Sequence, residues 1–189
     1  MELQEAILKR RSIRRFTDYF VTDDEIREVI EAARWAPSWA NTQVWEFIVA
    51  RDRKIIEDVV STYSEKNPAR KCSNSASVLI VACAKKGVSG HKKGSGPTKF
   101  SEWFMFDIGM AVQNLILKAH EIGIGSVVVG LIDHNACARV LDVPDTHEVV
   151  VVIPLGKSGV EEKEGPPRKE IESFVYKDRF GEAWASSPK

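Results

Sequence analysis

Three short runs of apolar residues place the tightest limit on how this chain folds. Residues 78–84 read Val-Leu-Ile-Val-Ala-Cys-Ala without a polar interruption, and residues 126–129 and 149–154 are nearly as apolar. A strand that is apolar on both faces belongs inside a sheet that is covered by helices on each side. A chain of 189 residues is also long enough for one well-buried core. We therefore expect a single α/β or α+β layered domain over residues 1–189.

Helical patterns occupy the segments around these runs. Residues 22–25, Thr-Asp-Asp-Glu, form a capping box that opens a helix, and Pro37 marks the end of that helix. The longest helix is expected over residues 102–122, and its sequence is apolar on nearly all sides. Such a helix is either deeply buried or packed against a partner subunit. Shorter elements are expected at residues 2–9 and 52–63, as helices, and at residues 45–50, as a strand.

Charge and cysteine content exclude several classes of protein. With 27 basic and 27 acidic residues the net charge is zero, so no overall field attracts nucleic acid or an anionic membrane. No apolar run approaches the roughly 20 residues that span a bilayer, and the first residues lack the apolar core of a signal peptide. The odd number of cysteines, with no CxxC pair, indicates buried free thiols in a reducing compartment. We expect a cytoplasmic protein.

Two segments outside the expected core have unusual compositions. Residues 85–100 are rich in lysine and glycine, and a loop of this length is typical of a functional lid or a disordered excursion. Residues 170–189 scatter aromatic side chains among charges, which indicates an arm that docks on another surface. The four histidines have no metal-ligand spacing with each other or with the cysteines, so no metal site is expected. The motifs GxGxxG, GxxxxGK[ST] and GxSxG do not occur.

A basic segment follows the first expected helix, Arg-Arg-Ser-Ile-Arg-Arg at residues 10–15. In an extended backbone, Arg10, Ser12 and Arg14 share one side. Guanidinium groups with a hydroxyl between them match the oxygens of a phosphate. The alternatives are a solvated basic cluster or a nucleic-acid patch, although the latter predicts a basic protein and the sequence pI is about 6.9.

Two further segments have the composition of a ligand site. Residues 37–45 concentrate amide and hydroxyl groups beside two tryptophans, which suits a planar heterocycle that forms hydrogen bonds. Residues 123–131 contain Gly123, well placed as the C-terminal cap of the long helix, and Gly130, which allows close approach to the backbone. Taken alone, each segment also fits an ordinary turn.

Together and in this order, the segments resemble the nitroreductase family of flavoproteins. The matching motifs are Arg10-Arg11-Ser12-x-Arg14, Pro37-Ser38-x-x-Asn41-x-Gln43, the helix residues 107–115, Gly123-Ile124-Gly125-Ser126, Pro154-Leu155-Gly156 and Pro166-Pro167-Arg168. The likeness covers about residues 3–170. Val44 stands where the family often has proline, and the loop at residues 85–100 matches no part of the family pattern.

The resemblance implies a fold, a cofactor and a reaction. The fold is α+β in three layers (α/β/α), with a central mixed sheet flanked by helices in an interlocked homodimer whose C-terminal arm, about residues 170–189, packs on the partner. FMN is the cofactor, and electrons pass from NADH or NADPH to a nitroaromatic, quinone or similar small-molecule acceptor. One flavin face serves donor and acceptor in turn, which gives ping-pong kinetics. The alternative within this fold is reductive dehalogenation or flavin processing.

The resemblance also assigns residues, none of which acts as a nucleophile. The FMN phosphate is held by Arg10, Ser12, Arg14 and Arg168, with Arg11 beside them. The other subunit supplies Pro37, Ser38 and Asn41, and Gln43 supports that loop or the flavin edge. Lys71 lies near the N1/O2 edge of the flavin, where its charge gives electrostatic support. The backbone of Val129, Gly130 and Leu131 donates toward flavin N5.

Overall fold

A four-stranded antiparallel sheet forms the centre of the fold, as the computed structural model shows for residues 1–91, 98–161 and 164–184. The strand order is β1-β2-β4-β3. The strands are β1 (Trp45–Ala50), β2 (Val78–Lys85), β3 (Gly125–Ser126) and β4 (His147–Gly156). The expected mixed sheet is not found within these residues, because each pair of neighbouring strands is antiparallel and parallel pairing is confined to an isolated bridge between Ser12 and Ser126 outside the strands.

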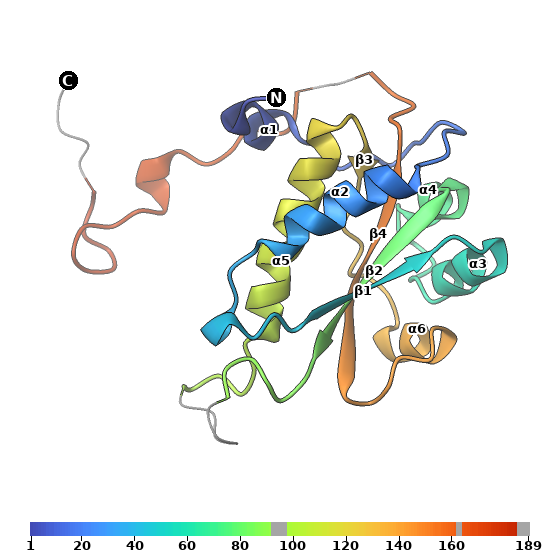
Figure 1. Cartoon of the computed structure of the whole chain (residues 1–189). Helices are drawn as coiled ribbons and strands as arrows, with labels where there is room; N and C mark the ends of the chain where they lie inside the picture. Colours follow the sequence, from blue (N-terminus) through green and yellow to red (C-terminus); the bar gives the residue numbers. More distant parts are fainter. Residues whose placement is uncertain (92–97, 162–163, 185–189) are drawn as a thin grey trace.

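Helices cover both faces of the sheet (Figure 1). The helices α2 (Asp23–Arg34) and α5 (Phe104–Glu121) lie on one face, and α3 (Arg53–Ser61), α4 (Arg70–Ser75) and α6 (His134–Val140) lie on the other. The predicted α+β fold in three layers is confirmed. The remaining helical elements are α1 (Leu3–Lys9) and the single turns η1 (Trp39–Asn41) and η2 (Ile171–Ser173).

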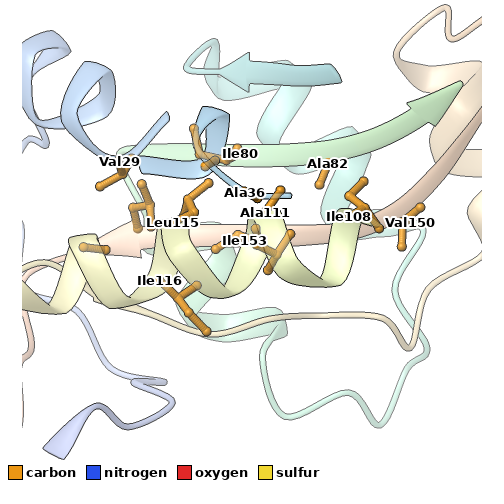
Figure 2. Packing of buried hydrophobic residues seen from close by; sticks show 14 of the residues in the cluster. Val29, Ala36, Ile80, Ala82, Ile108, Ala111, Leu115, Ile116, Val150 and Ile153 are labelled. Atoms are coloured by element: carbon orange, nitrogen blue, oxygen red, sulfur yellow. The ribbon is translucent and has the colours of Figure 1, made fainter. Parts of the chain in front are cut away.

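The central strand β2 divides its side chains between two separate cores. Ile80 and Ala82 point toward α2 and α5, where they pack with Leu115 and other side chains of α5 (Figure 2). Leu79 and Val81 point the opposite way, into the core under α3, α4 and α6. Burying one such aliphatic side chain stabilises the fold by about 1.5–3 kcal/mol. The unbroken apolar run in the sequence is therefore explained by helices on both faces of the sheet.

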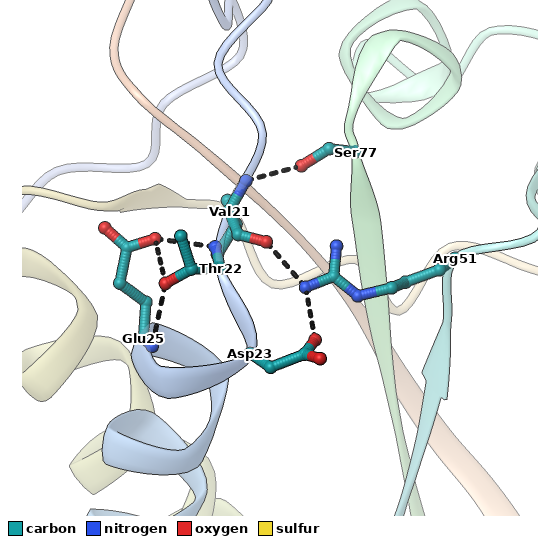
Figure 3. Close-up of polar contacts among 6 residues, drawn as sticks. All are labelled: Val21, Thr22, Asp23, Glu25, Arg51 and Ser77. Atoms are coloured by element: carbon teal, nitrogen blue, oxygen red, sulfur yellow. Dashed lines mark hydrogen bonds and ion pairs between the residues drawn. The ribbon is translucent and has the colours of Figure 1, made fainter.

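The predicted capping box is present and anchors the start of α2 (Figure 3). The hydroxyl of Thr22 accepts a hydrogen bond from the Glu25 N–H at 3.2 Å, and the Glu25 carboxylate accepts one from the Thr22 N–H at 2.7 Å. Arg51, directly after β1, donates to the Val21 carbonyl at 2.6 Å and to Asp23 at 2.9 Å. These bonds hold the N-terminus of α2 against the end of β1.

Most expected elements are found, with one shorter than predicted. The expected strand at residues 126–129 is reduced to β3 and an isolated bridge between Val129 and Val152, because only these residues pair with β4. All three cysteines are free and buried, as predicted. Burial raises the pKa of Cys83 to about 12 and that of Cys137 to about 11, so these thiols stay protonated and unreactive.

The long helix α5 is buried along one side and open along the other. Ile108, Ala111 and Leu115 are almost fully buried, whereas Met105 and Phe106 are 59% and 60% exposed. The C-terminal segment leaves the body of the fold near α1 and runs away from it (Figure 1). In the described parts of the chain, no helix is long and apolar enough to cross a membrane, and no cluster of side chains suits a metal ion.

Candidate functional site

A cavity of about 510 Å³ lies at the C-terminal end of α5. Its wall is formed by the end of α1, the last turn of α5, the glycine-rich turn that follows, and the segment after β4. Arg10, Arg11 and Ser12 line it, and so do the carboxylates of Glu121, Glu161 and Glu164. The first of the three predicted motifs therefore borders this cavity.

The backbone that carries Arg10, Ser12 and Arg14 is extended and fixed to the sheet. The N–H of Ile13 donates to the Ser126 carbonyl at 2.9 Å, beside the parallel bridge from Ser12. The Ile13 side chain packs against Gly125, where an added Cβ would lie 3.0 Å from it. Ser12 and Arg14 are exposed on the opposite side, as the predicted alternation requires.

Arginines from two segments of the chain influence one another here, and the carboxylates that line the cavity form no ion pair with them in the described structure. Burial lowers the pKa of Arg10, and the nearby charges of Arg11 and Arg168 lower it further, which places these three guanidinium groups close together. Among described residues, no carboxylate lies within ion-pair distance of Arg10, Arg11, Arg14 or Arg168. A cluster of arginines that repel one another is the donor set that a phosphate group would satisfy.

The C-terminal segment passes close to the end of α1 at Arg11. Arg11 donates from Nη1 to the Leu8 carbonyl at 2.5 Å and to the Arg10 carbonyl at 2.8 Å. Gly165 lies so close to the Arg11 guanidinium that a Cβ there would collide with it, and the buried Nε of Arg11 has no hydrogen-bond partner among described atoms. Arg168 donates to the Pro166 carbonyl at 2.8 Å. The closing Pro-Pro-Arg motif thus meets the opening Arg-Arg-Ser motif in space.

Lys71 lies on α4, on the side of the fold that Arg14 faces. Burial raises the pKa of the neighbouring Cys72, and the Ser73 hydroxyl and the positive charge of Arg14 partly offset that effect. Arg14 is therefore near α4. Lys71 itself is exposed and has no ion-pair partner in the described part of the chain. Its ammonium group is thus open to solvent.

The segment that carries Gly130 and Leu131 presents two backbone donors. Neither N–H has a hydrogen-bond partner among the described residues, and Leu131 is 62% exposed. Val129, the third predicted donor, gives its N–H to the Val152 carbonyl at 2.9 Å in this chain. The Leu131 carbonyl is held by the side-chain amide of Asn67 at 2.9 Å. Sequence reasoning missed Asn67, although Asn-Pro is a recognisable turn signal.

The loop that contains Pro37, Ser38, Asn41 and Gln43 lies near the other end of α5. Three residues of this loop have left-handed backbone conformations. Their φ angles are +46° at Ala40, +56° at Asn41 and +48° at Gln43. Such conformations cost about 1–3 kcal/mol each for residues other than glycine and cluster at functional sites. The Ser38 hydroxyl accepts from the Gln43 N–H at 2.9 Å, and the Gln43 amide donates to the Asn41 side chain at 3.2 Å.

A buried carboxylate anchors this loop to α5. Asp107 is 1% exposed, and it accepts hydrogen bonds from the Trp39 N–H at 3.0 Å and from the Ser89 hydroxyl at 2.6 Å. Sequence reasoning placed Asp107 only within a helix motif and assigned it no role. The signal that could have revealed it is an acidic residue inside an otherwise apolar helical stretch, Phe104–Gly109.

The two groups of predicted site residues are far apart within one chain. Asp107, which binds the Ser38 loop, and His120, which lines the cavity beside Arg10, are thirteen positions apart on α5. At 1.5 Å per residue this separation is about 20 Å. Figure 1 shows η1 near the N-terminal end of α5 and α1 near its C-terminal end. The arginine cluster and the Ser38 loop therefore do not meet within a single subunit.

Comparison with known proteins identifies the family of this chain. The sequence profile of the Nitroreductase family matches residues 7–157. The chain belongs to the nitroreductase family. That match includes all of the predicted site segments except Arg168.

Individual known proteins match nearly the whole chain. A protein named putative NADH dehydrogenase/NAD(P)H nitroreductase, from Archaeoglobus fulgidus, is 31% identical over 95% of this chain and 93% of its own length. A solved nitroreductase family protein from Clostridium novyi NT is 28% identical, with a TM-score of 0.75 and 97% of each chain covered. A solved oxidoreductase described as containing FMN is 26% identical, with a TM-score of 0.79, and covers 94% of this chain and 92% of its own.

Proposed function

We propose that this nitroreductase-family protein is an FMN-dependent oxidoreductase that passes electrons from NADH or NADPH to a nitroaromatic, quinone or similar small acceptor. The observation that carries the proposal is the cluster of arginines around Arg10, which forms no ion pair with a carboxylate among described residues. The names of the Archaeoglobus relative and of the FMN-containing structure support the same reading. When bound, FMN supplies the redox chemistry, and the protein supplies binding, orientation and electrostatics.

Four side chains would hold the FMN phosphate. The guanidinium groups of Arg10, Arg14 and Arg168 offer forked donors, and the Ser12 hydroxyl adds one more. The extended backbone fixed by Ile13 presents Ser12 and Arg14 on its open side. Arg11 would stand beside the phosphate and add positive charge, while its Nη1 holds the carbonyls of Leu8 and Arg10.

Other residues of the same subunit would contact the isoalloxazine ring. The free N–H groups of Gly130 and Leu131 would donate to it, since neither is used within the described chain. Lys71 would place its ammonium near the N1/O2 edge, where negative charge on the ring is stabilised by a cation. Gln43 would support the Asn41 loop or the ring edge, because its amide already contacts Asn41.

A second copy of the chain would supply Pro37, Ser38 and Asn41. Within one subunit this loop is about 20 Å along α5 from the arginine cluster. Gly109 supports an interface on the open side of α5. An added Cβ at Gly109 would meet no atom within 4 Å in the chain itself, although a glycine inside a helix costs about 1 kcal/mol relative to alanine. A partner that packs closely against Gly109 explains why no side chain occupies this position.

The homodimer also accounts for the exposed aromatic residues of the C-terminal arm. Phe174 and Phe180 are 56% and 91% exposed in the single chain, a large apolar area for a segment left in water. We propose that this arm packs on the partner subunit. The buried free cysteines match a reducing cytoplasm, which is the location we propose.

Reductive dehalogenation or flavin processing in the same fold is the second candidate. It is favoured by the rings of Phe100, Trp103 and Phe106, which form edge-to-face contacts near the Ser38 loop and would suit an aromatic substrate. The acidic and aromatic lid of the dehalogenating branch has no match in the lysine-rich stretch at residues 85–100, of which residues 92–97 lie outside the described structure. A screen of halogenated phenols against quinones separates the two reactions.

The decisive experiment is spectroscopic. The purified protein is expected to show flavin absorbance bands, and NADH or NADPH is expected to bleach them in a stopped-flow instrument. Steady-state rates at several acceptor concentrations should give parallel double-reciprocal lines, the pattern of ping-pong kinetics. A protein that neither carries nor binds added FMN would contradict the proposal, and intersecting lines would remove the ping-pong scheme.

A further inference from the structure

The buried carboxylate of Asp107 joins two loops that the sequence places far apart. One of its oxygens accepts from the Trp39 N–H in the Ser38 loop, and the other accepts from the Ser89 hydroxyl in the turn after β2. Ser89 is fully buried. A carboxylate in the first turn of a helix is favoured by the helix dipole, but that role requires neither of these two bonds.

The turn at residues 87–91 is itself tied to the residues that lead into α5. The Trp103 N–H donates to the Ser89 carbonyl at 3.2 Å, and the Gly87 N–H donates to Glu102 at 2.9 Å. Gly90 has φ of +84°, and a Cβ there would collide with the Trp103 ring. Moving Ser89 therefore moves Trp103.

Trp103 is the centre of a cluster of aromatic rings that reaches the Ser38 loop. Its ring centroid lies 5.4 Å from that of Trp39, 5.6 Å from that of Phe100 and 5.9 Å from that of Phe106. Phe100 and Phe106 are 52% and 60% exposed. The cluster thus presents open aromatic surface directly beside the loop that Asp107 holds.

We propose that Asp107 is a positioning residue that fixes the Ser38 loop and the aromatic cluster relative to each other, and so sets the affinity for the electron acceptor. The inference rests on the proposed function, in which the Ser38 loop borders the flavin of the partner subunit. The left-handed residues Asn41 and Gln43 need an external anchor, and the bond from Trp39 to Asp107 provides it. Ser89 extends that anchor to the rings, which then contact a planar acceptor.

Three variants of the full-length, flavin-loaded protein separate the two connections. Ser89→Ala removes the connection to the rings and leaves the bond from Trp39 to Asp107. Asp107→Ala removes both connections. Asp107→Asn keeps an oxygen for the Trp39 N–H and places an amide donor opposite the Ser89 hydroxyl, so it is the conservative rescue. Ser61→Ala, an exposed serine on α3, is the matched control.

The readouts are near-ultraviolet circular dichroism of the paired tryptophans, the Kd for FMN, and kcat and KM with a quinone acceptor. We expect Ser89→Ala to change the dichroism and raise the acceptor KM about tenfold with unchanged FMN affinity, because one hydrogen bond to a charged group is lost. Asp107→Ala should weaken FMN binding as well, and Asp107→Asn should restore most of both properties.

Failure of the inference and failure of the proposed function look different. If wild-type protein binds no FMN, the proposed function is wrong, and so is the role of Asp107 in setting the affinity for the electron acceptor. If wild-type protein is flavin-loaded and active, but Ser89→Ala has wild-type dichroism and acceptor KM, the positioning role is overturned. A fall in kcat alone, with unchanged KM in all three variants, would also overturn it and leave Asp107 with a role in folding only.

Discussion

The two ends of helix α5 present different chemistry. At its C-terminal end, Arg10 and Arg11 line a cavity of about 510 Å³, and the charge of Arg168 acts on Arg10. At its N-terminal end, the loop around Asn41 has little charge, left-handed backbone conformations and a buried carboxylate as its anchor. We propose that the first end binds a charged group, whereas the second holds a backbone loop and several rings in place.

This difference is the reason for the proposed homodimer. A charge site tolerates small displacements, because Coulombic attraction falls slowly with distance. A site made of amides and rings depends on contacts at hydrogen-bond range, so its loop needs a rigid support. Since the two ends are about 20 Å apart along α5, a compact ligand that uses both needs the charge site of one subunit and the loop of another.

The largest effect is expected from Gly109→Glu, which tests whether the two ends meet across a subunit interface. The side chain enters open space in the single chain and improves helix propensity, so the subunit should stay folded. A charged side chain should nevertheless prevent packing against a partner. We expect a monomer by analytical ultracentrifugation, with FMN affinity lowered at least about a hundredfold because every contact from the partner is lost.

Val49→Glu is the matched control for Gly109→Glu. Val49 is a partly exposed residue on the edge strand β1, away from the open side of α5. This variant should remain dimeric and bind FMN normally. A well-folded, flavin-loaded monomer of Gly109→Glu would show that each subunit holds a complete FMN site. That result would contradict the proposal that the two ends of α5 meet only across a subunit interface.

The next largest effect is expected at the charged end alone. Arg10→Ala and Arg14→Ala each remove a charge-assisted hydrogen bond worth about 1.5–3 kcal/mol, so FMN affinity should fall roughly ten- to a hundredfold. Flavin titration of the folded variants measures this. Arg15→Ala is the control, because Arg15 alternates to the other side of the extended segment. Unchanged affinity in both variants would remove the phosphate assignment.

A smaller effect is expected from Lys71→Met, which probes the ring rather than the phosphate. Loss of the ammonium should slow flavin reduction and lower the flavin potential by tens of millivolts, since about 30 mV corresponds to 1.4 kcal/mol for a two-electron couple. FMN affinity should change little. Lys66→Met, an exposed lysine before α4, is the control. If Lys71→Met has the wild-type flavin potential and reduction rate, Lys71 is a solvated surface residue that has no role in flavin reduction.

The smallest effect is expected from Thr22→Ala, a change at neither end of α5. Loss of the capping box at α2 should lower the free energy of unfolding by about 1 kcal/mol, measured by denaturant titration at one fixed protein concentration. FMN affinity should be unaltered. A large loss of FMN in this variant would mean that binding follows overall stability, so the effects at Arg10 and Arg14 could not be assigned to the site.

Local physics made much of the fold readable from the sequence. The apolar run of β2, the capping box at Thr22 and the alternation of Arg10, Ser12 and Arg14 each depend on neighbours a few positions away. For the same reason, the ordered motifs sufficed to indicate the family, which the profile match then confirmed. The assignments of individual residues to FMN stay predictions.

Other features depend on pairs of residues that the sequence does not link. Whether Val129 has a free N–H was decided by Val152, which lies 23 positions away and consumes it. The role of Asp107 was decided by Trp39 and Ser89, which reach it from 68 and 18 positions away. The sequence alone determined which groups could bind a phosphate or a ring. Only the tertiary structure decided which of them were already committed to each other, because a hydrogen-bond donor or acceptor is used up by whatever partner the packing brings within 3 Å.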